Sequence, residues 1–128
     1  MYLRFVVHAL HEESNRRTGV FQEIYRLMRA RELPVYEERR AREILDWFNE
    51  NLDTPARFAA SSRHHAAARA ISWFKDSASE HISRMRELAA ILEAHGVAVE
   101  IIRTPRPGYI AYEDKYQIVA EPFADTPS

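Results

Sequence analysis

The sequence contains no cysteine in its 128 residues. This absence excludes disulfide frameworks, cysteine-containing zinc sites, thiol catalysis and redox switching within the chain. Nothing therefore favours an oxidising compartment, and we expect a cytoplasmic protein. Long hydrophobic runs are also missing, since none reaches the roughly 18–20 apolar residues of a membrane-spanning helix. We accordingly expect no membrane contact.

The apolar start of the chain lacks the features of a secretory signal. Arg4 and His8 interrupt residues 1–10, and no small-residue cleavage site follows them. The segment is better explained as a β-strand, because its strongly apolar side chains recur at every second position. These side chains are Leu3, Phe5 and Val7.

An excess of charge of one sign is absent as well. The chain has 18 Lys and Arg against 19 Asp and Glu, for a formal net charge of −1. This balance argues against a general polyanion binder, which usually carries a large basic excess. With 46% hydrophobic and 29% charged residues, the chain also lacks the composition of a disordered protein. We expect one folded domain over residues 1–121 and a tail over residues 122–128.

Lysine is scarce, because Lys75 and Lys115 are the only two among the 18 basic residues and the rest are arginine. A bacterial-like, GC-rich coding sequence explains such a bias. Arginine also makes bidentate contacts with phosphate and carboxylate groups. The composition therefore permits an anion site without indicating one.

Two regions after the first strand carry apolar residues at helical spacing. The first follows a polar loop over residues 11–19 and ends at Pro34, because proline disfavours the helical conformation in the residue before it. The second begins at Pro34 and ends before Pro55. Their apolar stripes comprise Phe21, Ile24, Leu27 and Met28 in the first, and Ala41, Ile44, Leu45, Phe48 and Leu52 in the second.

The third helical region is the longest, and two patterns compete in it. Its apolar positions step by three and four without losing phase, which favours one helix from Ser62 to His95, ended by Gly96. Ser77, followed three residues later by Glu80, is instead a capping box that would start a new helix. We expect the single helix because the phase is unbroken. Its stripe comprises Ile71, Phe74, Ala78, Ile82, Met85, Ala89 and Leu92.

After Gly96 the hydrophobic period changes to two, which predicts three short strands at residues 97–102, 109–113 and 116–120. The last two are expected to form a hairpin with its turn at residues 114–115. The element order is then one strand, three helices and a three-strand meander. This order predicts an α+β domain with a four-stranded, mostly antiparallel sheet and the helices on one face.

One charge anomaly lies at residues 54–75, which contain four basic and no acidic residues. Subtracting this +4 from the total of −1 leaves −5 for the rest of the chain. The four residues are Arg57, Arg63, Arg69 and Lys75. In the expected third helix, Arg63, His64 and His65 fall in the first turn, where the helix dipole favours acidic side chains.

A bound anion would relieve this conflict, since free backbone amides, serine hydroxyls and arginine all donate hydrogen bonds to phosphate. We therefore expect a site for a nucleotide or nucleic-acid phosphate in this segment. The alternatives are a solvated loop and a contact with a protein partner. The expected ligand-binding residues are Arg57, Ser61, Ser62, Arg63, His64 and His65.

The loop after the first strand offers a second candidate site. A polar loop between a strand and a helix is a common place for ligands. In a small enzyme acting on a phosphorylated or nucleic-acid substrate, His8 or His11 would act as acid or base, and Arg16 and Arg17 would clamp the anion. The phosphate-loop and HEXXH patterns are absent. We expect neither a metal nor a cofactor.

Aromatic residues indicate a candidate interface. Trp47 and Trp73 each precede a phenylalanine of an expected core stripe and would be turned about 100° away from it on a helix. The expected hairpin is rich in tyrosine, a residue enriched at interface hot spots. Packing within the hairpin is the alternative explanation. The candidate interface residues are Trp47, Trp73, Tyr109, Tyr112 and Tyr116.

Three functions remain open on the sequence alone. The leading hypothesis is a small binding or regulatory protein that self-associates and holds an anionic ligand, such as a nucleotide or nucleic-acid phosphate. The second is the small enzyme described above. The third is a protein-interaction subunit with no small ligand.

Overall fold

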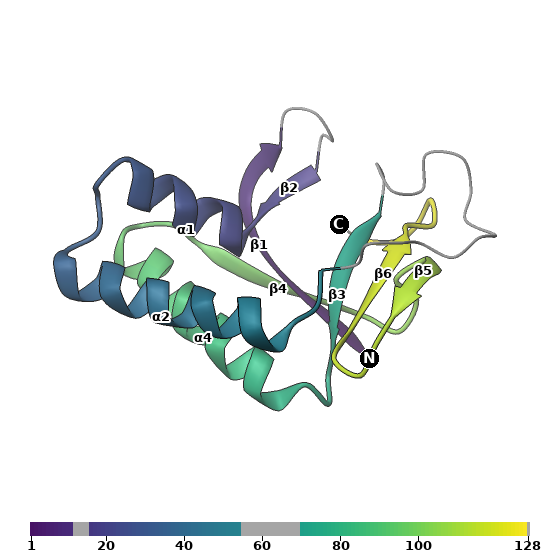
Figure 1. The fold of residues 1–128 in the computed structure, drawn as a ribbon. Helices are drawn as coiled ribbons and strands as arrows, with labels where there is room; N and C mark the ends of the chain where they lie inside the picture. Colours follow the sequence, from purple (N-terminus) through teal and green to yellow (C-terminus); the bar gives the residue numbers. More distant parts are fainter. Residues whose placement is uncertain (12–15, 55–69, 128) are drawn as a thin grey trace. The chain divides into compact units, whose positions relative to one another are not determined.

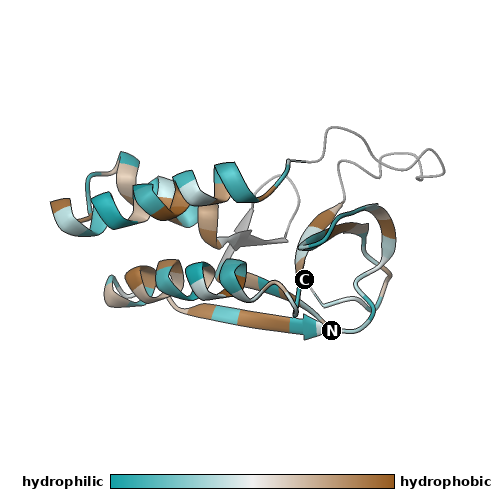
Figure 2. Cartoon of the chain, turned by 60° about the horizontal axis from the view of Figure 1, so that its bottom comes forward, coloured by the Kyte–Doolittle hydropathy of each residue, from teal (hydrophilic) through white to brown (hydrophobic). Residues whose placement is uncertain are grey.

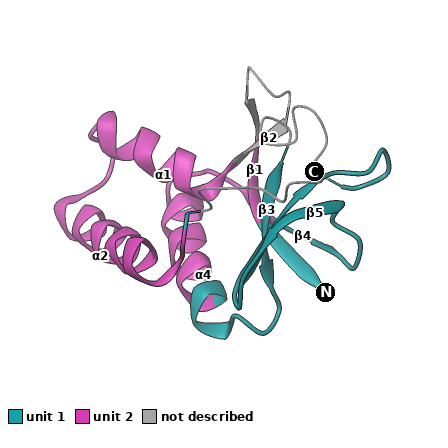
Figure 3. Cartoon of the chain, turned by 45° about the vertical axis from the view of Figure 1, so that its right-hand side comes forward, with its two compact units in different colours: residues 1–4, 54–82, 101–128 teal, residues 5–53, 83–100 magenta. Residues whose placement is uncertain are grey.

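A computed structural model describes residues 1–11, 16–54 and 70–127 of the chain (Figure 1). The described residues form an α+β structure with three helices and six strands. None of these helices is long and apolar enough to cross a membrane. The chain divides into two compact units, which Figure 3 colours separately. Unit 1 comprises residues 1–4, 54–82 and 101–128, and unit 2 comprises residues 5–53 and 83–100.

Unit 2 contains the two helices that the sequence predicts best. Helix α1 (Val20–Arg29) has Gly19 as its N-cap residue, and α2 (Val35–Asn51) has Pro34 as its N-cap residue. Both helices contain hydrophobic and hydrophilic residues, as the colours of Figure 2 show. Their buried apolar residues largely match the expected stripes and are Val20, Ile24, Leu27, Met28, Ala41, Ile44, Leu45 and Phe48.

The expected loop over residues 11–19 is wrong in part. Strand β1 (Tyr2–His11) continues to the start of that segment, and Arg16–Gly19 forms a second strand, β2, that pairs with it in antiparallel register. Apolar alternation is missing from the sequence Arg-Arg-Thr-Gly of β2. Polar residues are common on edge strands, and β2 is the first strand of the sheet order. Pairing with β1, rather than local pattern, therefore specifies this strand.

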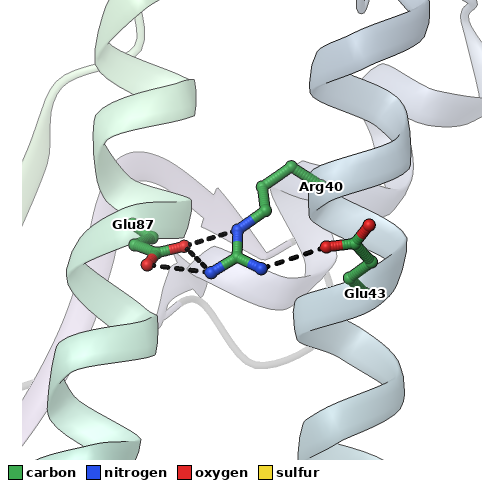
Figure 4. A network of polar contacts seen from close by, with 3 residues as sticks. All are labelled: Arg40, Glu43 and Glu87. Atoms are coloured by element: carbon green, nitrogen blue, oxygen red, sulfur yellow. Dashed lines mark hydrogen bonds and ion pairs between the residues drawn. The ribbon is translucent and has the colours of Figure 1, made fainter.

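Within unit 2, α2 lies beside the part of α4 (Ser79–Ala94) that belongs to the same unit. The Arg40 guanidinium on α2 donates to Glu87 on α4, with Nε 2.8 Å from Oε2, and to Glu43, with one terminal nitrogen 3.0 Å from Oε2 (Figure 4). These hydrogen bonds, first to Glu87 and then to Glu43, raise the pKa of Arg40. Because all three side chains are about half exposed, the network adds at most about 1 kcal/mol per pair.

Unit 1 is built around antiparallel strands. Strand β3 (Ile71–Lys75) pairs with the start of β1 on one side and with β6 (Gln117–Glu121) on the other, and β6 also pairs with β5 (Tyr109–Glu113). The complete strand order is β2-β1-β3-β6-β5, and β4 (Val99–Thr104) pairs with β1. Every residue of β6 is buried. The core of unit 1 is therefore centred on β6.

The single third helix is a wrong prediction. Residues 71–75 form β3, and α4 begins at Ser79, so the capping-box pattern beginning at Ser77 indicated the helix start more accurately. A step of three also separates buried residues on opposite faces of a strand, as for Ile71 and Phe74. The helical stripe was thus extended through residues that belong to β3. The expected C-terminal glycine is confirmed, because Gly96 has a φ of +80° just after α4.

The three-strand meander is also wrong. Strands β5 and β6 form the expected hairpin, but β4 pairs with β1 instead of with β5. On the side of β6 that faces away from β5, the partner strand is β3. In the part of the chain that the structure describes, β5 consequently has a partner strand on one side only.

Candidate functional site

The predicted phosphate site lies almost entirely outside the described residues, which omit positions 55–69. Of the four basic residues in this segment, Lys75 is described, and its Nζ lies 2.6 Å from Oε2 of Glu113. The single helix on which the dipole argument relied is not formed, because α4 begins at Ser79. The first turn that the argument concerned lies outside the described residues. The basic excess of the sequence remains. The predicted ligand-binding residues outside the described part are Arg57, Ser61, Ser62, Arg63, His64 and His65.

The second predicted site falls on the β1–β2 hairpin. Its register places His11 opposite Arg16 and Leu10 opposite Arg17. His8 is exposed on β1. It lies between Val6 and Leu10, where the register of the β1–β2 pairing shifts. The hairpin thus brings one histidine and one arginine to facing backbone positions. Among the described residues, no cluster of three or more His, Asp or Glu side chains is arranged to hold a metal ion.

The two tryptophans lie in different environments. Trp73 is on strand β3 and only 1% exposed, so the prediction of an outward-facing helical tryptophan is wrong. Trp47 is half-buried on α2, where the Arg84 guanidinium lies 3.8 Å from its ring centroid. Trp73 therefore belongs to the core of the chain. Trp47 contacts Arg84 within unit 2.

The three tyrosines of the hairpin do not form one cluster. Tyr109 pairs with Glu121 at one end of the β5–β6 ladder, whereas Tyr116 lies in the turn at the other end. The Tyr116 ring lies 4.4 Å from that of the buried His81. The Tyr112 hydroxyl donates to Asp114 at 2.9 Å. Tyr109 alone among the three is an exposed residue.

The turn between β5 and β6 is organised by Asp114. Its Oδ1 accepts hydrogen bonds from the backbone N–H groups of Tyr116 and Gln117, and its Oδ2 accepts from the Tyr112 hydroxyl and the Gln117 side chain. Burial acts to raise the pKa of Asp114, but these hydrogen bonds outweigh it and lower the pKa. The charged carboxylate thus locks the hairpin turn.

The other end of the hairpin is fixed by Gly108. Its φ is +139°, and a Cβ at this position would overlap the carbonyl of Glu121. Only glycine permits this close approach of the two backbones. The residues that we expected to trail from the domain pack here, since the ring of Phe123 lies 4.6 Å from that of Tyr109. The Arg106 guanidinium lies 5.0 Å from the Phe123 ring.

Two large apolar side chains follow Gly108 at the sheet edge. Tyr109 is 47% exposed and Ile110 is 46% exposed, although both belong to a paired strand. Ile110 and Arg106 were not among the predicted site residues. The sequence signal for Ile110 was its place between tyrosines in a short strand. It was missed because the expected meander would have covered β5 with another strand.

Comparisons with protein-family models, with curated proteins and with solved structures found no match to this chain. The function must therefore be argued from the residues themselves. The described residues expose large apolar side chains at two pairs of neighbouring positions, Val35 and Tyr36 on α2 and Tyr109 and Ile110 on β5. We define the β5 edge as β5 together with the preceding residues 106–108.

Proposed function

We propose that this chain is a protein-binding module whose contact surface is the β5 edge. The observation that supports this function is the exposure of Tyr109 and Ile110 on a strand that has one partner strand in the described part. Exposed apolar and aromatic side chains that lie close together are typical of surfaces that contact other proteins. Tyr109 and Ile110 would supply this apolar contact to a bound peptide or protein segment.

The other edge of the sheet order lacks these properties. Strand β2 has the sequence Arg-Arg-Thr-Gly, which contains no large apolar residue. Strand β5, in contrast, exposes the large apolar side chains of Tyr109 and Ile110. A contact through apolar side chains is therefore favoured at β5 over β2.

The test is selection of peptides from a displayed random library against the purified protein. Peptides enriched on the wild type should bind Ile110→Lys at least about tenfold more weakly, a loss that corresponds to about 1.4 kcal/mol. Tyr36→Lys is the matched control, because Tyr36 is also exposed, at 71%, but belongs to α2 of the other unit. Enrichment of no peptide, or equal losses for both variants, would contradict the proposal.

A second proposal keeps the anionic ligand and is supported by the basic excess at residues 54–75. Because Glu113 already neutralises Lys75, the three arginines of the segment are the expected contacts. Sulfate, nucleotides and short single-stranded nucleic acid should raise the melting temperature at low salt, since ligands that bind the native state stabilise it. Arg63→Ala should abolish the shift and Arg86→Ala should keep it. No shift with any of these ligands would refute the site.

A further inference from the structure

We infer that the partner of the β5 edge is a protein segment in which a carboxylate lies beside an apolar side chain, and that Arg106 binds this carboxylate. The inference rests on the proposed function, because it names the chemistry of the segment that contacts Tyr109 and Ile110. It adds one charged contact to the apolar contacts of that surface.

The backbone of Arg106 is held in place from both sides. Pro105 and Pro107 flank it, and a proline restricts the residue before it to extended conformations. The backbone N–H of Arg106 donates to Thr104 Oγ1 at 3.1 Å, and its carbonyl accepts from Thr126 Oγ1 at 3.5 Å. Binding through Arg106 therefore has little backbone ordering to offset.

The guanidinium of Arg106 has an aromatic neighbour but no acidic one. It lies 5.0 Å from the centroid of the Phe123 ring, which packs edge-to-face against Tyr109. In the described part of the chain, no carboxylate forms an ion pair with Arg106. A guanidinium over a ring face keeps the N–H donors of its own plane available for a bidentate contact with a carboxylate. Because Arg106 is exposed, a group of another molecule can reach these donors.

The other charge of the β5 edge is already neutralised. The carboxylate of Glu113 contacts Lys75, with Nζ 2.6 Å from Oε2. The remaining charge of the edge is therefore the positive charge of Arg106, and the complementary group is an anion. Tyr109 and Ile110, each nearly half exposed, favour an apolar side chain next to that anion. A polypeptide that carries an acidic residue beside an apolar one supplies both groups.

The test uses the peptides that display selection enriches on the wild type. These peptides should share an aspartate or glutamate next to an apolar residue. Arg106→Gln should bind them about tenfold more weakly, because it removes the charged, bidentate donor. Arg103→Gln is the matched control and should leave the dissociation constant unchanged, since Arg103 is an exposed arginine on β4 of the same unit.

A second measurement assigns the loss to the contact itself. Replacing the acidic residue of the peptide by its amide should weaken binding to the wild type by about tenfold. The same replacement should have no effect on binding to Arg106→Gln, because two groups in direct contact are energetically coupled. Added salt should likewise weaken binding to the wild type more than binding to Arg106→Gln, since it screens the ion pair.

Enriched peptides that depend on Ile110 but bind Arg106→Gln as tightly as the wild type would overturn the inference and leave the proposed function standing. Displacement of the peptide by short single-stranded DNA, lost in Arg106→Gln, would assign the arginine to phosphate and overturn the inference as well. A selection that enriches no peptide would contradict the proposed function and the inference together.

Discussion

Strands β5 and β6 are neighbours of equal length, joined by a single turn, yet they lie in opposite environments. All five residues of β6 are buried, including Gln117 and Glu121. Strand β5 has one buried residue, Ala111, and exposes Tyr109 and Ile110. The more aromatic of the two strands is therefore the more exposed.

This contrast teaches that strand order decides burial here more than composition does. β6 has a partner strand on each side, β3 and β5, whereas the outer side of β5 has no partner strand among the described residues. An edge with large apolar side chains is a liability unless another chain covers it. We therefore interpret the exposure of β5 as functional.

The largest expected effect comes from shortening a buried side chain of β6. Ile118→Ala should lower the free energy of unfolding by about 4 kcal/mol, because Ile118 is fully buried and its removal leaves a cavity. Ile110→Ala should cost less than about 1 kcal/mol, because Ile110 is 46% exposed. Urea denaturation of both variants measures the difference. Equal losses would mean that β5 is as deeply packed as β6.

The next effect concerns Gly108, where the backbone just before β5 lies close to Glu121 at the end of β6. Gly108→Ala should destabilise the fold by about 2 kcal/mol or more, because it combines backbone strain with overlap at the Glu121 carbonyl. Gly19→Ala is the control and should cost less than about 1 kcal/mol, since no atom lies within 4 Å of a Cβ there. Thermal unfolding of the two variants decides whether this contact is required.

A smaller effect is expected at the turn that joins the strands. Asp114→Asn should cost about 1 kcal/mol at neutral pH, because an amide nitrogen cannot accept hydrogen bonds from Tyr112 and Gln117. The pKa of Asp114 in the folded state lies below its usual value of 3.8. The stabilisation is therefore complete above that pH and is lost as the pH falls through the lower folded value.

Denaturant unfolding between pH 2.5 and 7 measures this dependence. The gap between wild type and Asp114→Asn should close toward the acidic end, because the wild-type carboxyl becomes protonated there. Asp125→Asn is the control at an exposed aspartate and should show no such dependence. A gap that stays constant with pH would show that the charge of Asp114 does not lock the turn.

Much of the fold was predictable from local pattern. The class, the first two helices with their buried stripes, and the bounds of β5 follow from hydrophobic periodicity and from Gly19 and Pro34. β3 was missed because the spacing of Ile71 and Phe74 fits a helix as well as a strand covered on both faces. β2 was missed because its residues carry no apolar alternation.

The candidate site was predictable only in part. Tyr109 was identified from its residue type and place in the hairpin, whereas Ile110 and Arg106 depend on the edge position of β5. That position follows from the pairing of β4 with β1 and of β3 with β6, contacts between segments far apart in the sequence. Trp73 was assigned to a surface because a helix was expected where β3 lies. Local pattern carries no information on such long-range pairing.

The most direct test of the β5 edge as a contact surface is amide hydrogen exchange of β5 and β6, measured with and without a peptide enriched in the selection. Exchange in β5 should slow when the peptide is bound, while β6 should be protected equally in both states, because its partners belong to the same chain. Ile110→Lys should remove the effect of the peptide on β5 without altering β6. Exchange in β5 that is the same with and without the peptide in the wild type would contradict the account.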